Sequence, residues 1–140
     1  FRSSSTANHF TSLAVEGFLK EHMQEHKDNQ NAALLEKRNA MISSFGEHFG
    51  GTGAKLSEPQ GGCYTWLEMP IGTDMTSLRD KAFDAGVGYI AGSVYAPNGD
   101  GDNYARLCFG YESPEKNRDG VALLAQILDE NGMLNAAPRD

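Results

Sequence analysis

Basic residues, cysteines and long apolar runs are all scarce in this 140-residue sequence. Lysine and arginine number 12 against 19 aspartate and glutamate, so the formal net charge is -7. The basic residues form no stripe, which argues against a protein that follows nucleic-acid phosphates. No apolar stretch approaches the roughly 20 residues that cross a bilayer, and no export signal opens the chain. The sequence therefore predicts a cytoplasmic protein without a nucleic-acid or membrane partner.

Residues that commonly bind metals are few and poorly spaced. Cys63 and Cys108 have neither the CxxC spacing of a zinc site nor the density of a disulfide scaffold, and they are predicted to be buried free thiols. His22, Glu25 and His26 fit the H-x-x-E-H pattern of certain zinc peptidases. The polar residues around them favour an exposed helix face instead, so we predict no metal site.

The first third of the chain has the periodicity of helices. Residues 1–8 show no period, and a helix with one buried face is then predicted up to about His26. Its apolar stripe is Phe10, Leu13, Ala14, Gly17 and Phe18. The polar stretch 25–31 is predicted to separate it from a second helix, which Gly50 to Gly53 would end. The second stripe is Leu34, Met41, Ile42, Phe45 and Phe49.

The rest of the chain alternates short strands with helices. Residues 54–57, 63–69 and 87–91 predict strands, and a loop is expected over 92–103. Asp74 is predicted to cap a helix that stops at Gly86, with Met75, Leu78, Ala82 and Phe83 on its inner face. Ser113, followed by Pro114 and Glu115, predicts the start of the last helix. This order predicts an α+β fold in which a small, mainly antiparallel sheet packs against helices.

Arg106 stands inside the apolar run 104–109 and is the most informative residue of the chain. In a strand it shares one face with Tyr104 and Cys108, while Ala105, Leu107 and Phe109 take the other. No acid in this run neutralises it, and an unpaired, partly desolvated guanidinium costs several kcal/mol, roughly. A carboxylate ligand would supply the charge through two parallel hydrogen bonds. The alternatives are an arginine that reaches solvent from a sheet edge and an ion pair with a distant acid.

Three motifs in register give a resemblance to a known family. Residues 59–66 (PQGGCYTW), 86–95 (GVGYIAGSVY) and 106–109 (RLCF) resemble the C-terminal part of class I/II, fold-type I pyridoxal-phosphate aminotransferases. The family patterns are P-x-G-G-hydrophobic-aromatic-x-W, G-V-x-x-x-P-G-x-x-F and R-L-x-F-S. The resemblance covers nearly the whole chain and looks closest to the 2-aminoadipate, kynurenine and aromatic amino-acid aminotransferases.

The resemblance implies roles for four residues. Arg106 would grip the α-carboxylate of the amino-acid and 2-oxo-acid substrates. Gly61 and Gly62 would let the backbone approach the substrate closely. Tyr64 would line the mouth of the pocket, although ordinary core packing is an equal alternative.

The sequence departs from the family pattern at three positions near these residues. Ala91 replaces a proline, Tyr95 a phenylalanine and Gly110 a serine. Arg106 is retained, so the departures leave carboxylate binding in place and substrate choice open.

The same resemblance implies a domain organisation. Residues 1–30 would be an interdomain helix region, 31–134 the small C-terminal domain and 135–140 a tail. The chain begins with Phe rather than Met, and its six lysines lie on predicted polar helix faces, in a short strand or in the first turn of a helix. The large domain, with the lysine that holds pyridoxal 5'-phosphate, is therefore expected upstream of residue 1.

By itself the 140-residue piece is predicted to be inactive and not to hold the cofactor, and the full-length enzyme is predicted to be a homodimer. Two alternatives to an aminotransferase remain open. One is a pyridoxal-phosphate lyase of the same fold, which would use the same arginine. The other is an aminotransferase-like sensing domain of a transcription regulator.

Overall fold

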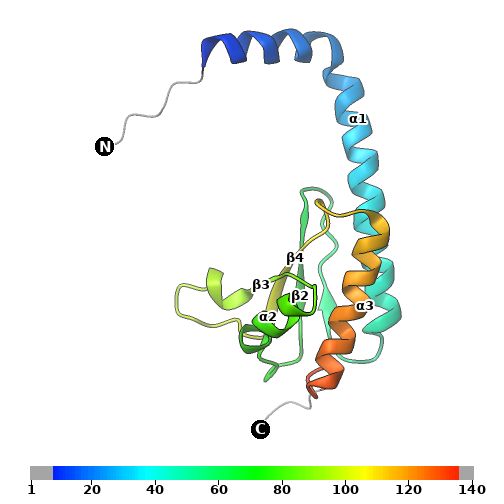
Figure 1. The fold of residues 1–140 in the computed structure, drawn as a ribbon, viewed down its shortest axis with the longest axis vertical. Helices are drawn as coiled ribbons and strands as arrows, with labels where there is room; N and C mark the ends of the chain where they lie inside the picture. Colours follow the sequence, from blue (N-terminus) through cyan, green and yellow to red (C-terminus); the bar gives the residue numbers. More distant parts are fainter. Residues whose placement is uncertain (1–7, 136–140) are drawn as a thin grey trace. The chain divides into compact units, whose positions relative to one another are not determined.

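The structure, a computed structural model, describes residues 8–135 (Figure 1). The residues predicted as an N-terminal aperiodic segment and as a tail lie outside this range, apart from Asn8 and Asn135. The chain divides into two compact units, Phe1–Ala33 and Leu34–Asp140. Within residues 8–135 no helix combines the length and the apolar character needed to cross a membrane.

A single helix, α1, runs over His9–His48, so the predicted break at residues 25–31 is wrong. That stretch contains neither glycine nor proline, and a fully solvated helix needs no apolar stripe to keep its backbone hydrogen bonds. The Asn8 side chain accepts a hydrogen bond from the Thr11 N–H (3.1 Å) and caps the first turn. The predicted burial of the first stripe is also wrong, since Phe10 and Leu13 are 82% and 52% exposed.

The sheet has four strands among the described residues, in the order β1-β2-β4-β3, and every neighbouring pair is antiparallel. The strands are β1 (Lys55–Leu56), β2 (Tyr64–Glu68), β3 (Ile90–Ala91) and β4 (Tyr104–Cys108). The predicted α+β architecture is confirmed. The strand predicted over 87–91 is shorter than expected because the Val87 N–H instead donates to the Ala82 carbonyl (2.9 Å) at the end of a helix.

Two further helices complete the second unit, α2 (Met75–Asp84) and α3 (Pro114–Glu130). The predicted caps are confirmed, because Asp74 accepts from the Ser77 N–H (2.9 Å) and Ser113 from the Lys116 N–H (3.2 Å). The predicted loop 92–103 contains a 3-10 helix, η1 (Gly92–Tyr95). Phe83 is 71% exposed rather than buried, because it lies one residue beyond the stripe that faces the core.

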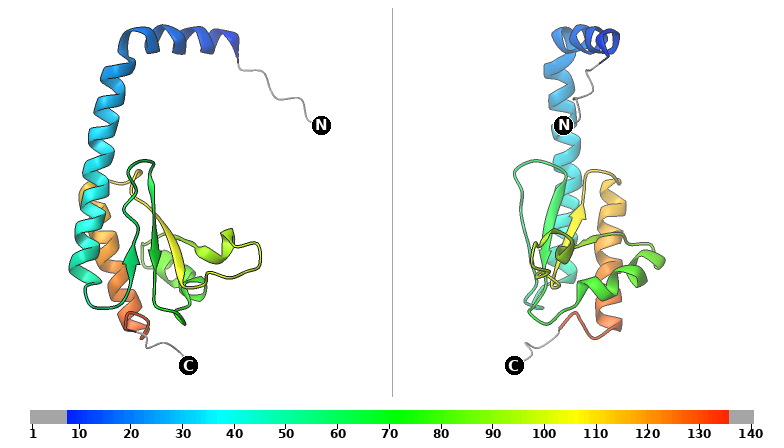
Figure 2. Two further views of the ribbon diagram at one scale, coloured as in Figure 1. Left: turned by 180° about the vertical axis from the view of Figure 1, so that it is seen from behind. Right: turned by 90° about the vertical axis from the view of Figure 1, so that its left-hand side faces the viewer.

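The core of the second unit lies on one face of the sheet, where α2, α3 and the C-terminal part of α1 pack (Figures 1 and 2). Alternation along β4 buries Ala105 and Leu107, as predicted, and alternation along β2 buries Leu67 on the same side. The opposite face carries Tyr64, Trp66 and Arg106. No helix of the described chain contributes to a core on that face, so it is the open face of the sheet.

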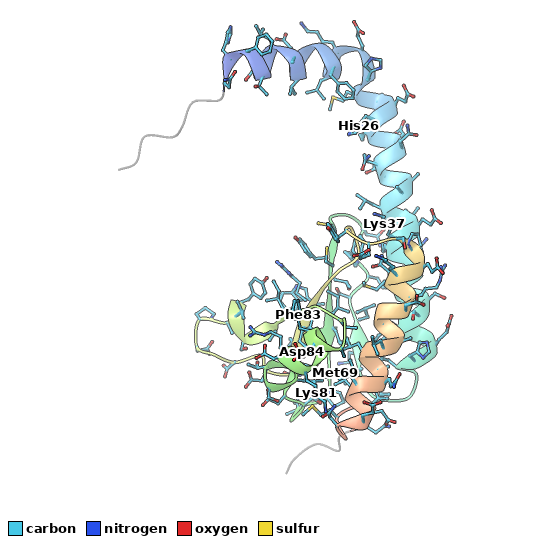
Figure 3. All side chains as sticks on the ribbon, in the orientation of Figure 1. His26, Lys37, Met69, Lys81, Phe83 and Asp84 are labelled. Atoms are coloured by element: carbon cyan, nitrogen blue, oxygen red, sulfur yellow. The ribbon has the colours of Figure 1, made fainter. Side chains whose placement is uncertain are left out.

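Two side-chain hydrogen bonds connect the residues just after β4 to the helices, and a third joins two helices to each other. The Lys37 Nζ, on α1 (Figure 3), donates to the Gly110 carbonyl (3.0 Å). The buried Asn117 Nδ2, on α3, donates to the Phe109 carbonyl (2.9 Å). The Ser44 Oγ on α1 donates to the Arg118 carbonyl (2.9 Å), which ties the two helices together. The end of the strand that carries Arg106 is therefore connected to both α1 and α3.

Tyr89 gives the fold a predicted dependence on alkaline pH. Its side chain is 7% exposed, and its hydroxyl donates to the Met75 carbonyl (2.7 Å). Burial, with a further contribution from the Asp74 charge, raises the pKa of the phenol well above its ordinary value. In the unfolded chain the Tyr89 phenol ionises near pH 10, whereas in the folded chain it stays protonated at that pH. The free energy of unfolding should therefore fall above about pH 10, by up to about 1.4 kcal/mol per pH unit.

Urea unfolding between pH 7 and pH 11 measures this effect. Tyr89→Phe should lose about 1 kcal/mol at pH 7 and lose this component of the alkaline slope. Tyr111→Phe is the matched control, because Tyr111 is 85% exposed, and it should keep the wild-type slope. An equal alkaline slope in wild type and Tyr89→Phe would contradict the prediction.

Candidate functional site

Arg106 lies at the middle of β4 on the open face of the sheet. In the strand register it stands opposite Trp66 of β2 on one side and Ile90 of β3 on the other. Its side chain is half-buried. Arg106 is therefore central in the sheet, not at an edge from which a long side chain would escape to solvent.

Aromatic rings from both flanks of β4 hold the guanidinium group. The Arg106 Cζ lies 4.1 Å from the ring centroid of Tyr64, which belongs to β2. It lies 5.0 Å from the ring centroid of Tyr95, at the end of η1. Tyr95 also meets Trp66 edge to face, with centroids 5.5 Å apart and an interplanar angle of 82°. These contacts form an aromatic cluster, Tyr64, Trp66 and Tyr95, around one cation.

The charge of Arg106 has no acidic partner within the described part of the chain. No ion pair within 4.0 Å joins it to an aspartate or glutamate there. Its Nε is buried and forms no hydrogen bond with residues 8–135. The guanidinium is thus neither free in solvent nor neutralised, and a planar anion could receive its donors.

Gly61 and Gly62 lie in an exposed turn before β2. Gly62 has a φ of 78°, which a residue with a Cβ rarely adopts, so the turn explains this glycine. A Cβ at either position would meet nothing within 4 Å in this chain. The turn leads into Cys63, whose carbonyl accepts the N–H of Phe109 (3.0 Å), and so it lies beside the end of β4.

The sequence did not identify Tyr95 as part of the site. Its only sequence signal is the departure from the family phenylalanine, within the predicted loop 92–103. Trp66 belonged to a motif but received no role, because only the strand register sets it opposite Arg106. A hollow of about 310 Å³ adjoins these residues, with Trp66, Tyr95 and Tyr104 among those that line it.

The predicted burial of both cysteines is wrong. Cys108 is exposed and Cys63 is half-buried. Cys108 follows Arg106 by two positions in β4, so alternation turns its thiol to the same open face.

The lysine side chains all contact other groups of this chain. An oxygen of this chain lies within 3.5 Å of each lysine Nζ. Each lysine side chain therefore has a partner within the described chain. The pairs are Lys20 with Glu16, Lys27 with Gln24, Lys37 with Gly110, Lys55 with Glu68, Lys81 with Asn131 and Lys116 with Glu112.

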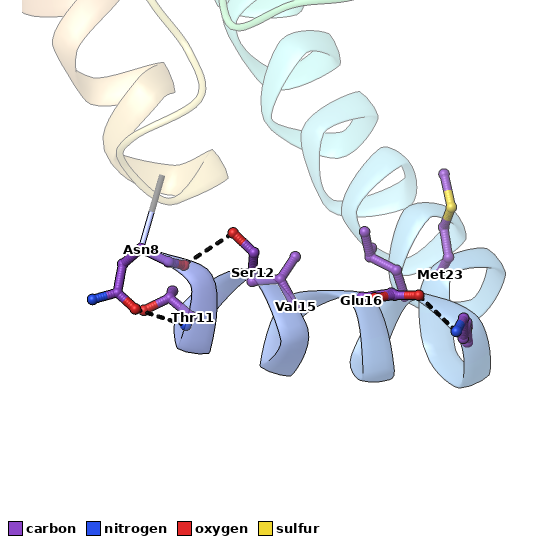
Figure 4. Close-up of a pocket in the computed structure, with 8 residues that line it drawn as sticks. Asn8, Thr11, Ser12, Val15, Glu16 and Met23 are labelled. Carbon is purple, nitrogen blue, oxygen red and sulfur yellow. Dashed lines mark hydrogen bonds and ion pairs between the residues drawn. The ribbon is translucent and has the colours of Figure 1, made fainter. Parts of the chain in front are cut away.

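A separate hollow of about 640 Å³ lies along α1 in the first unit (Figure 4). Val15, Leu19 and Met23 give it an apolar lining, and its charged residues Glu16 and Lys20 pair with each other (2.7 Å). Its other polar residues, Asn8, Thr11 and Ser12, form hydrogen bonds with one another in the first turn of α1. Within residues 8–135 no group of three or more His, Cys, Asp or Glu side chains could hold a metal ion.

Comparison with known proteins identifies relatives for most of the chain. No protein-family model matches. An aromatic-amino-acid aminotransferase of Thermococcus litoralis is 35% identical over 94 residues, which is 67% of this chain and 22% of that protein. The solved α-aminoadipate aminotransferase of Thermus thermophilus is 27% identical with a TM-score of 0.76, over 83% of this chain and 30% of that one.

A relative of another kind also matches. An uncharacterised HTH-type transcriptional regulator of Bacillus subtilis is 29% identical over 118 residues, which is 84% of this chain and 24% of that protein. The chain thus spans about a quarter of the length of the curated relatives it matches.

Proposed function

We propose that this chain, which matches the C-terminal region of class I pyridoxal-phosphate aminotransferases, is the part of such an enzyme that binds the substrate α-carboxylate. The enzyme would transfer an amino group between an amino acid and a 2-oxo acid. The observation that carries the proposal is the unpaired, half-buried guanidinium of Arg106 on the open face of the sheet.

Arg106 would bind the carboxylate through two parallel N–H donors. A planar fork fixes the orientation of the carboxylate as well as its position, which a lysine ammonium does not. The aromatic cluster reduces the water around the ion pair and thereby strengthens it. Tyr64 and the turn at Gly61 and Gly62 would flank the bound substrate.

Pyridoxal phosphate, when bound, withdraws electrons from the substrate and makes its α-proton acidic. Each lysine of this chain has a partner within it, and on that support we propose that the cofactor is held by the larger part of the enzyme upstream of residue 1. The role of this chain is then to bind and orient the substrate. We further propose, from the same resemblance, that the full-length enzyme is a cytoplasmic homodimer and that the 140-residue chain by itself is inactive.

A half-reaction assay on the full-length protein tests the proposed activity. The protein, loaded with pyridoxal phosphate, is mixed with the standard amino acids, 2-aminoadipate and kynurenine in turn. A transaminase should convert the bound cofactor to pyridoxamine phosphate and release a 2-oxo acid in equal amount. Release of product while the cofactor stays pyridoxal phosphate would instead identify a lyase.

A second candidate function is the sensing domain of a transcription regulator, which the match to the Bacillus subtilis protein favours. In that case the substrate-like ligand would be bound but not converted. A winged helix-turn-helix in the encoded sequence before residue 1, together with no half-reaction, would select this function over catalysis.

A further inference from the structure

We propose that Tyr64 and Tyr95 are positioning residues, whose rings orient the Arg106 guanidinium by cation–π contact and leave its N–H groups for the substrate carboxylate. This inference rests on the proposed function of Arg106. It adds Tyr95 to the site and gives Tyr64, already proposed to flank the substrate, a second role that acts through the arginine.

The first argument is the lack of any other support for the guanidinium. A long arginine side chain is usually oriented by an acid or a carbonyl oxygen, and no hydrogen bond or ion pair to residues 8–135 does so here. The ring contacts of 4.1 and 5.0 Å are what remains. An aromatic ring attracts the cation without using its N–H donors, so it does not compete with a carboxylate as an acid would.

The second argument is that the fold fixes both rings. Tyr64 is held by its place in β2, paired with Cys108 of β4. Tyr95 is held by its ring contact with Trp66 and by the packing of η1 against the start of β4. A Cβ on Gly92, the first residue of η1, would lie 2.5 Å from both the Gly101 carbonyl oxygen and the Tyr104 Cβ, so only glycine lets η1 come this close to the start of β4.

Nuclear magnetic resonance on the 140-residue chain tests the ring contacts directly. The Arg106 Nε–H proton should resonate upfield of that of Arg118, an exposed arginine of α3, because ring currents shield it. Tyr95→Leu should move the Arg106 signal toward the Arg118 position, and Tyr95→Phe should leave it in place. A signal that already matches Arg118 in the wild type, or that neither Tyr64→Leu nor Tyr95→Leu moves, would overturn the inference.

Kinetics of the full-length protein test the consequence, with the best amino-acid donor from the half-reaction assay. Tyr95→Leu should raise KM about 5-fold with kcat little changed, and Tyr95→Phe should restore KM. In an Arg106→Lys background the same Tyr95→Leu change should raise KM less than about 2-fold, because the two residues act as a unit.

The outcomes separate the two proposals. If Tyr95→Leu raises KM equally in the wild-type and Arg106→Lys backgrounds, the positioning role is wrong, and the proposed function of Arg106 is unaffected. If Arg106→Lys by itself leaves kcat/KM unchanged, the proposed function is wrong. Full rescue by phenylalanine also excludes a role for the Tyr95 hydroxyl.

Discussion

Arg106→Lys in the full-length enzyme is expected to lower kcat/KM by at least about 30-fold, which is about 2 kcal/mol of transition-state stabilisation. Lysine keeps the positive charge, so the decrease in kcat/KM measures the contribution of the two parallel guanidinium donors and not that of the charge. The shorter reach of a single ammonium also removes the stacking on Tyr64, whose ring lies 4.1 Å from the Arg106 Cζ. Steady-state kinetics with several amino acids should show the same loss for each, because every substrate carries the same α-carboxylate.

Arg79→Lys is the matched control for this experiment. Arg79 is an exposed arginine of α2 that pairs with its neighbour Asp80 (2.8 Å). The control should keep wild-type kcat/KM, because surface ion pairs of this kind contribute little. If Arg106→Lys matches the control, the carboxylate is bound elsewhere and the proposed role of Arg106 is wrong.

Phe109→Ala is expected to destabilise the 140-residue chain by about 3 to 5 kcal/mol, a large part of the stability of an ordinary domain. Phe109 directly follows β4, is 2% exposed and belongs to the core cluster. Its backbone also connects elements, since its N–H donates to the Cys63 carbonyl and its carbonyl accepts from Asn117. Removing the ring leaves a cavity beneath the strand that carries Arg106. Urea unfolding followed by circular dichroism measures the loss.

Phe83→Ala provides the comparison, because it deletes the same ring from a position that is 71% exposed (Figure 3). It should cost no more than about 1 kcal/mol. Phe109→Leu keeps most of the apolar volume and should cost about 1.5 kcal/mol, so a measurable value exists even if the alanine variant does not fold. Similar losses for Phe83→Ala and Phe109→Ala would contradict the assignment of the core.

Much of the fold was predictable from local signals. The caps at Asp74 and Ser113 and the turn residues around the strands are read within a few positions, because they depend on the backbone of their own segment. Alternation along β4 predicted correctly that Ala105 and Leu107 are buried and that Arg106 is on the other face. The predicted burial of Phe10, Leu13 and Phe83 was wrong for a common reason. Whether an apolar residue is buried depends on which partner is present, and the pattern does not show the partner.

The sequence by itself determined that a cation lies in a strand with no nearby acid, and the motifs around it indicated a carboxylate ligand. Only the tertiary structure decided how that cation is held. Tyr64 and Tyr95 are 42 and 11 positions from Arg106 in the chain, and they meet it because β2 pairs with β4 and η1 sits against the start of β4. Strand register and close backbone approach are properties of the packed chain, so no local pattern could place those rings on the guanidinium.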